Sequence, residues 1–279
     1  MFDFAEKRPS EIPIVVLDTE TTGLSAALGH RVVEIALVRL EQWRVTAEMT
    51  QLLNPGRLMD ARASQVNGLT DADLVGQPRF AQVAPEVLAL LDGALLVAHN
   101  AAFDASFLAM EFFISGYSQE GQPILANPWL CTLTLARNCF YFGQNKLGHL
   151  AHRLGVRMGQ AHRALGDVYM TVEVLKRMVQ ELQKQRLVTV GDLLHAQGGP
   201  IYAPSPPQVY LPPPIAEALQ YGRDLHILYI SPGSGESDRR ITPMYPTVQD
   251  GTPYLVAYCH VRQEQRTFRL DRIFSARVV

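Results

Sequence analysis

Hydrophobic and polar residues follow two successive patterns along this 279-residue chain. The first part opens with apolar and alternating runs of strand length, predicted at 14–18, 32–40 and 43–53. An amphipathic helix at 80–91 and a short buried strand at 94–98 follow, and then an apolar helix ends at residue 113. Further helices are predicted at 132–140, 146–154 and 163–184. This order predicts an α/β fold with helices packed on a central sheet.

A proline-rich segment between Gly198 and Pro214 interrupts this pattern. Prolines at this density cannot continue a helix or the interior of a sheet, so the segment reads as an extended linker. A short helix at 215–221 follows, and then strand-like runs at the short, regular spacing of a small barrel. These runs are 225–230, 240–245, 254–261, 267–270 and 273–279. We predict one domain at 1–190, a short helix and linker at 191–214, and a small β domain at 215–279.

The composition is that of an ordinary globular protein, with 47% hydrophobic and 19% charged residues. Three widely spaced cysteines suggest neither a disulfide framework nor a zinc site. The N-terminus lacks the apolar stretch of a signal peptide, and no run reaches the length of a membrane span. We therefore expect a cytoplasmic protein with no membrane partner. The net charge of −2 does not decide the function, because bound metal can offset catalytic carboxylates.

Asp18 and Glu20 stand one residue apart at the end of the first apolar strand. Side chains alternate along a strand, so both carboxylates project from one face at its C-terminal end, where enzymes built on open sheets keep their chemistry. Their repulsion is relieved if a cation lies between them, and clustered oxygen ligands suit Mg²⁺ or Mn²⁺. A solvated pair of acids at a strand end is the commoner case for such a motif on its own.

Two further acids lie at the ends of other predicted elements. Asp104 follows the buried strand at the start of a helix, and Asp167 lies early in another helix, five residues after His162. A two-metal phosphodiesterase needs about four carboxylates and a base, because its cations activate water and stabilise the leaving oxygen. The chain supplies such a set from separate elements, as a site built at sheet and helix ends requires.

Three ordered motifs now identify a family resemblance. Leu-Asp-Thr-Glu-Thr-Thr-Gly-Leu at 17–24, Ala-His-Asn-Ala-Ala-Phe-Asp at 98–104 and Ala-His-Arg-Ala-Leu-Gly-Asp at 161–167 resemble the motifs of the DEDDh family, the DnaQ-like 3′–5′ exonucleases. The connecting segments at 31–36 and 145–150 are also similar. The resemblance covers about residues 12–184 and implies a ribonuclease H-like fold with a central mixed sheet.

The resemblance also implies roles for individual residues. Asp18, Glu20 and Asp167 would bind one of two divalent ions, Mg²⁺ or Mn²⁺, and Asp18 and Asp104 would hold the second. His162 would take the proton from the attacking water. The implied reaction releases nucleoside monophosphates from single-stranded ends.

Substrate contacts follow from the same resemblance. Thr21 and Leu24 would position the terminal nucleotide, and Phe103 would stack or wedge against its base. The segment Asn67–Thr70 departs from the His-Gly-Ile-Thr often found in the family, which affects a substrate contact and leaves the catalytic set intact. DNA is favoured on family grounds, and RNA is the alternative because no motif here reads a 2′-hydroxyl.

The C-terminal part resembles a WYL domain, an Sm- or SH3-like small barrel, at residues 239–243, 251–258 and 266–273. Its signature reads Pro-Tyr-Leu at 253–255. The resemblance implies a bacterial protein and a nucleic-acid, small-ligand or protein partner. Residues 215–279 hold eight arginines, no lysine and seven acids, and a guanidinium matches phosphate bidentately. Five arginines are candidate nucleic-acid contacts: Arg239, Arg240, Arg266, Arg269 and Arg272. Surface arginines that serve solubility are the alternative.

Two other functions compete with an active exonuclease. One is a weak or inactive nuclease fold that serves as a binding module, against which the complete set of carboxylates and histidine argues. The other is a ligand-responsive regulator, and no helix-turn-helix candidate precedes the WYL-like part. Both alternatives assign the chain binding rather than catalysis.

Overall fold

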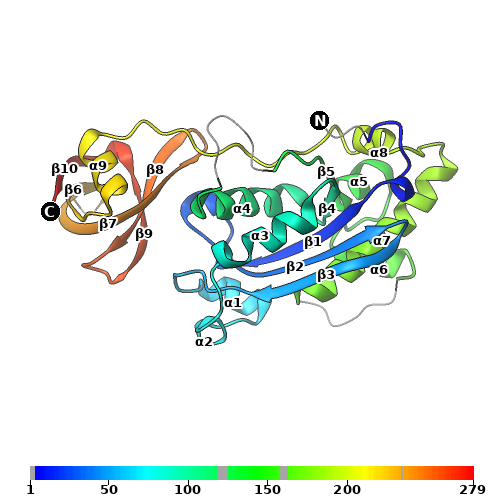
Figure 1. Ribbon diagram of the computed structural model, residues 1–279, viewed down its shortest axis with the longest axis horizontal. Coiled ribbons are helices and arrows are strands. Elements are labelled where there is room, and N and C mark those ends of the chain that lie inside the picture. The colour runs from blue at the N-terminus through cyan, green and yellow to red at the C-terminus, as the bar shows by residue number, and fades with distance from the viewer. Residues whose placement is uncertain (1–3, 118–124, 157–162, 234) are drawn as a thin grey trace. The chain divides into compact units, whose positions relative to one another are not determined.

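The computed structural model describes residues 4–117, 125–156, 163–233 and 235–279. By its contacts the chain divides into two compact units (Figure 1). The first comprises Met1–Thr22 and Val32–Ser205, and the second comprises Gly23–Arg31 and Pro206–Val279. The predicted base, His162, lies outside the described residues.

The first unit is built on a mixed five-stranded sheet with the order β3-β2-β1-β4-β5. Its strands are β1 (Ile14–Thr21), β2 (Val32–Glu41), β3 (Arg44–Leu52), β4 (Leu95–Ala98) and β5 (Trp129–Cys131). Strand β1 is antiparallel to β2 and parallel to β4. The predicted strands are confirmed, and β1 runs three residues beyond Asp18 because β2 pairs with it as far as Thr21.

Helices cover both faces of this sheet (Figure 1). They are α1 (Ala61–Asn67), α2 (Asp71–Leu74), α3 (Phe80–Leu91), α4 (Ala101–Ile114), α5 (Thr132–Cys139), α6 (Leu147–Arg153), α7 (Ala164–Lys184) and α8 (Val190–Ala196), together with the 3-10 turn Pro9–Glu11. On one face, Ile14 and Val16 of β1 share a core with Val168 and Leu175 of α7. The alternate residues of β1 are buried on the other face, so this strand lies at the centre of the unit.

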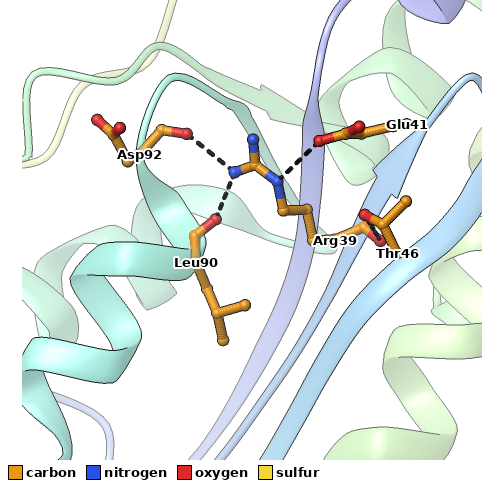
Figure 2. Close-up of polar contacts among 5 residues, drawn as sticks. All are labelled: Arg39, Glu41, Thr46, Leu90 and Asp92. Atoms are coloured by element: carbon orange, nitrogen blue, oxygen red, sulfur yellow. Dashed lines mark hydrogen bonds and ion pairs between the residues drawn. The ribbon is translucent and has the colours of Figure 1, made fainter.

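Arg39 of β2 ties the sheet to the end of α3 (Figure 2). Its Nη1 donates hydrogen bonds to the carbonyl oxygens of Leu90, at 2.8 Å, and Asp92, at 2.9 Å, while Nε donates to Glu41 at 3.4 Å. The last carbonyls of a helix have no partner within the helix, and a cation there also complements the helix dipole. Arg39 therefore caps α3 and fixes where it ends on the sheet.

We expect Arg39→Met to lower the free energy of unfolding by about 1–2 kcal/mol, since hydrogen bonds from a charged donor are lost while the aliphatic part of the side chain is kept. Urea unfolding followed by circular dichroism measures this change. Arg44→Met, at an exposed position of β3, is the matched control and should change stability little. Equal stability of both variants would show that Arg39 does not cap the helix.

The second unit contains an antiparallel five-stranded sheet with the order β10-β6-β7-β8-β9. Its elements are the 3-10 turns Ala26–Leu28 and Leu270–Arg272, α9 (Pro213–Tyr221), β6 (Leu225–Ser231), β7 (Gly235–Gln249), β8 (Thr252–Cys259), β9 (Glu264–Arg269) and β10 (Ile273–Val278). Ile215 and Ala218 of α9 pack with Leu225, Ile241 and Phe268 of the sheet. Closure of this sheet into a barrel stays a prediction. The ladders of the described residues join the strands in one series, with β10 at one edge and β9 at the other.

Two elements of the second unit extend beyond their predicted bounds. Strand β7 has 15 residues, because its first half pairs with β6 and its second half with β8. Helix α9 begins at Pro213, and proline is favoured there because the first turn needs no backbone N–H donor.

No helix within the described part of the chain combines the length and the apolar character that crossing a membrane requires.

Candidate active site

The structure gathers three acids around the end of β1. Asp18, Glu20 and Asp167 each offer a carboxylate oxygen, and these oxygens all lie within 4.8 Å of one another. Asp18 and Glu20 alternate along the strand, which directs both to one side of the sheet. Asp167 comes from the first turn of α7, where its N–H donates to the Arg163 carbonyl at 3.1 Å. A strand and a helix far apart in sequence thus build one acidic cluster.

Asp104 lies in the first turn of α4, next to β1, and is 2% exposed. Its Oδ1 accepts hydrogen bonds from the backbone N–H of Thr19, at 3.1 Å, and from the Thr19 hydroxyl, at 2.8 Å. The ladder between β1 and β4 covers only Ile14–Val16, so Asp104 provides an acceptor where β4 has ended. Asp104 is thus anchored to β1 by Thr19. Among the described residues, it is not part of the cluster formed by Asp18, Glu20 and Asp167.

Burial and mutual repulsion disfavour the charged forms of these carboxylates. Burial raises the pKa of Glu20 to about 7, with Asp167 and Glu34 adding to the shift, while Asn67 and Arg163 oppose it. A carboxylate set of this kind is stabilised by a divalent cation, which supplies the missing positive charge.

The same physical cause acts on two aspartates near the end of β1, Asp18 and Asp104. Burial raises the pKa of Asp104 to about 7, although hydrogen bonds from Thr19 lower it. The pKa of Asp18 is well above its ordinary value, first through burial and then through repulsion from Asp104 and Glu20. Asp104 therefore repels the cluster electrostatically, although it is not one of the three acids whose oxygens lie within 4.8 Å of one another.

The predicted substrate contacts occupy different environments. Thr21, at the end of β1, is 8% exposed, whereas Leu24 is 87% exposed in the segment that groups with the second unit. Phe103 is half-buried on α4, with its ring centroid 4.7 Å from that of Phe107.

Two residues near the motifs were not predicted as functional. Glu34 of β2 lies opposite Glu20 in the ladder and is 3% exposed. An acid inside an otherwise apolar strand is the sequence signal that could have singled it out. His99, after β4, has a ring nitrogen 2.9 Å from the Thr132 hydroxyl, and burial lowers its pKa to about 4. His99 is therefore neutral near pH 7 and joins β4 to the start of α5.

Most of the arginines predicted to bind nucleic acid have partners within the second unit. Arg240 pairs with Asp224 at 2.6 Å, Arg266 with Glu264 at 3.1 Å and Arg269 with Asp271 at 2.6 Å. Arg239 donates to the Ser237 hydroxyl at 3.0 Å. Arg272 instead lines a hollow of about 300 Å³ with Ile230, Ser231, Pro232, Asp271 and Phe274. Three of these five arginines are therefore already paired with acids.

Comparison with known families agrees with this geometry. The exonuclease family of the RNase T type matches residues 15–175, and the WYL domain matches residues 213–278. The chain therefore belongs to the DnaQ-like, DEDDh-type exonuclease family and carries a WYL domain, and the acidic cluster is of the kind that holds divalent metal.

Several curated proteins are similar over the exonuclease part. A DNA polymerase III subunit epsilon-like protein of Rhodobacter capsulatus is 36% identical over 195 residues, covering 68% of this chain and 27% of the relative. The 3′-5′ exonuclease DinG of Bacillus subtilis is 32% identical over 180 residues, covering 64% of this chain and 19% of the relative. This chain thus spans about a quarter or less of these relatives.

Solved structures share the ribonuclease H-like exonuclease fold. Exonuclease X in complex with 5′-overhanging duplex DNA has a TM-score of 0.51 and 25% identity, covering 66% of this chain and 99% of that chain. The nuclease domain of 3′hExo, a DEDDh family member bound to rAMP, has a TM-score of 0.52 and 20% identity, covering 63% of this chain and 94% of that chain. The second likeness bears on the fold alone.

The pKa values predict how the metal-free protein responds to pH. Between about pH 4.5 and 7, folded Glu20 keeps a proton that the unfolded chain releases, so the free energy of unfolding should fall as pH rises through this range. Glu20→Gln should therefore raise the metal-free melting temperature at pH 8 and reduce the further rise that Mn²⁺ causes.

Differential scanning fluorimetry with EDTA or Mn²⁺ checks both effects. Glu86→Gln, at an exposed position of α3, is the control and should respond to Mn²⁺ as the wild type does. A lower metal-free melting temperature for Glu20→Gln at pH 8 would contradict the repulsion inferred for this site.

Proposed function

We propose that this chain is a metal-dependent 3′–5′ exonuclease that releases nucleoside monophosphates from single-stranded nucleic-acid ends, with DNA favoured over RNA. The observation that carries the proposal is the half-buried cluster of Asp18, Glu20 and Asp167 at the end of a central strand. Its oxygen ligands fit Mg²⁺ or Mn²⁺, and two such ions are proposed. When bound, the ions activate water and stabilise the leaving oxygen.

The roles proposed for the side chains rest on the family resemblance, and the acidic cluster supports part of them. Asp18, Glu20 and Asp167 are proposed to hold one ion, and Asp104 shares the second with Asp18. Two hydrogen bonds from Thr19 fix Asp104 beside β1, where it would be available to the second ion. His162 is proposed to accept the proton of the attacking water, since its neutral imidazole is a base near physiological pH.

The proposed polarity and substrate rest on the relatives. DinG is named a 3′-5′ exonuclease, and other relatives are named as DNA polymerase III components. Exonuclease X is seen with DNA and 3′hExo with rAMP, so DNA is favoured here and RNA remains the alternative substrate. Thr21, Leu24 and Phe103 are proposed to contact the terminal nucleotide.

Replacing the metal-binding carboxylates tests catalysis. Asp18→Asn and Asp167→Asn should each lower turnover by orders of magnitude, because the ions are no longer held where water is activated. His162→Ala should lower turnover by about 10²–10⁴-fold. Glu181→Gln, which breaks an exposed pair with Lys184 on α7, is the control and should retain activity.

The assay compares 3′-labelled and 5′-labelled strands of DNA and RNA, with Mn²⁺ or EDTA. Early release of the 3′ label as a mononucleotide, dependent on metal, supports the proposal. Undiminished cleavage in EDTA would overturn it, and a fully folded protein without cleavage of any strand would favour the binding-module alternative.

The WYL domain is proposed to aid substrate binding. The hollow that combines Arg272 with exposed Phe274 offers a guanidinium for phosphate and a ring for base stacking, as single-strand binders do. Arg239, Arg240, Arg266 and Arg269 are proposed to add charge around it. A small ligand or a protein at the same domain is the alternative partner.

The salt dependence of binding tests the Arg272 contact. In a variant whose catalysis is blocked by Asp18→Asn, Arg272→Ala should weaken binding of labelled single-stranded DNA and reduce the slope of log affinity against log salt by about 0.7. Arg223→Ala, which breaks a pair with Glu217, is the control and should leave the slope unchanged. Fluorescence anisotropy measures both. An unchanged slope for Arg272→Ala would remove this contact from the proposal.

A further inference from the structure

Glu34 is a carboxylate buried beside the acidic cluster. It lies opposite Glu20 in the antiparallel ladder of β1 and β2, and directly opposed residues place their side chains on the same face, a few ångströms apart. Its negative charge contributes to the raised pKa values of both Asp18 and Glu20. The side chain is 3% exposed, so Glu34 belongs to the interior rather than to the rim of the site.

One partner of Glu34 comes from the start of α7. Its Oε1 lies 3.1 Å from Nη2 of Arg163, whose side chain is 56% exposed. Among the described residues, the buried Oε2 accepts no hydrogen bond. A buried carboxylate is unfavourable unless it is paired and hydrogen-bonded, and here only half of this requirement is met.

Arg163 is the N-cap residue of α7, and its carbonyl accepts the N–H of Asp167. Arg163 and Asp167 are therefore linked through the first turn of the helix. The first turn of a helix has donors without helical partners, so its position depends on contacts made outside the helix. The ion pair with Glu34 is such a contact, and it joins this turn to the strand opposite Glu20.

We propose that Glu34 and Arg163 are positioning residues, whose ion pair fixes the first turn of α7 on β2 and so holds the Asp167 carboxylate against Asp18 and Glu20. This proposal rests on the proposed metal-dependent function. The partners of metal ligands orient them, and losing such a partner typically weakens metal binding or activity by about 10–100-fold.

A purely electrostatic role makes a different prediction. If Glu34 and Arg163 acted only through their charges, removing the negative charge would weaken cation binding and removing the positive charge would strengthen it. If the ion pair positions Asp167, both substitutions weaken binding, and the double variant loses little more than either single one. The sign of the Arg163 effect therefore separates the two roles.

The experiment measures Mn²⁺ binding to the full chain by electron paramagnetic resonance for Glu34→Gln, Arg163→Gln and the double variant. We expect each single variant to bind Mn²⁺ about 10–100-fold more weakly, and the double variant to match them within about threefold. Arg163→Lys should recover part of the loss. Glu173→Gln, which breaks an exposed pair with Lys176 on the same helix, is the control and should bind as the wild type does.

Two further measurements make the outcome unambiguous. Circular dichroism and thermal unfolding identify any variant that fails to fold. If one of the two single variants does not fold, Mn²⁺ binding by the other single variant tests the proposal. Tighter Mn²⁺ binding by Arg163→Gln, or additive losses in the double variant, would overturn the proposal.

Asp18→Asn is measured in parallel. If Asp18→Asn abolishes metal binding while Glu34→Gln and Arg163→Gln do not weaken it, the positioning role fails and the metal site stands. If all three bind Mn²⁺ normally, the proposed function fails as well.

Discussion

Repulsion among the buried and half-buried carboxylates at the end of β1 is the constraint to which the surrounding structure responds. Three of the acids are partly compensated: Asp104 accepts two hydrogen bonds from Thr19, Asn67 lowers the pKa of Glu20, and Glu34 pairs with Arg163. None of these contacts brings a positive charge between the ligand oxygens of the three-residue cluster. The remaining imbalance is what a divalent cation relieves, so the same crowding that destabilises the metal-free fold favours metal binding.

The sheet supports this arrangement because β1 lies between β2 and β4 and is buried on both faces. Its apolar half anchors the strand in the core shared with α7, and its polar half emerges where the ladder with β4 has ended. The stabilising and the destabilising residues are thus adjacent in one strand. Burial of the first half offsets the unfavourable electrostatics of the second.

Much of this fold could be predicted from the sequence because its strands and helices carry strong periodic patterns. The helix at 80–91 and the strands around the first motif agree with the structure, as does the meeting of Asp18, Glu20 and Asp167. The contact of Glu34 with Arg163 could not be predicted, since it depends on the register of β2 and the direction in which α7 begins. The full length of β7 was also missed, because its pairing with two partners is a tertiary property.

The second unit shows why a charge count does not define a binding surface. The sequence suggested a basic face from eight arginines, yet three of the five candidates pair with nearby acids. A phosphate that approached these arginines would compete with a carboxylate already in place, so their contribution to binding is reduced. Arg272, beside the exposed ring of Phe274, combines a cation with a stacking surface. The nucleic-acid contact that we propose for this domain therefore depends more on local geometry than on net charge.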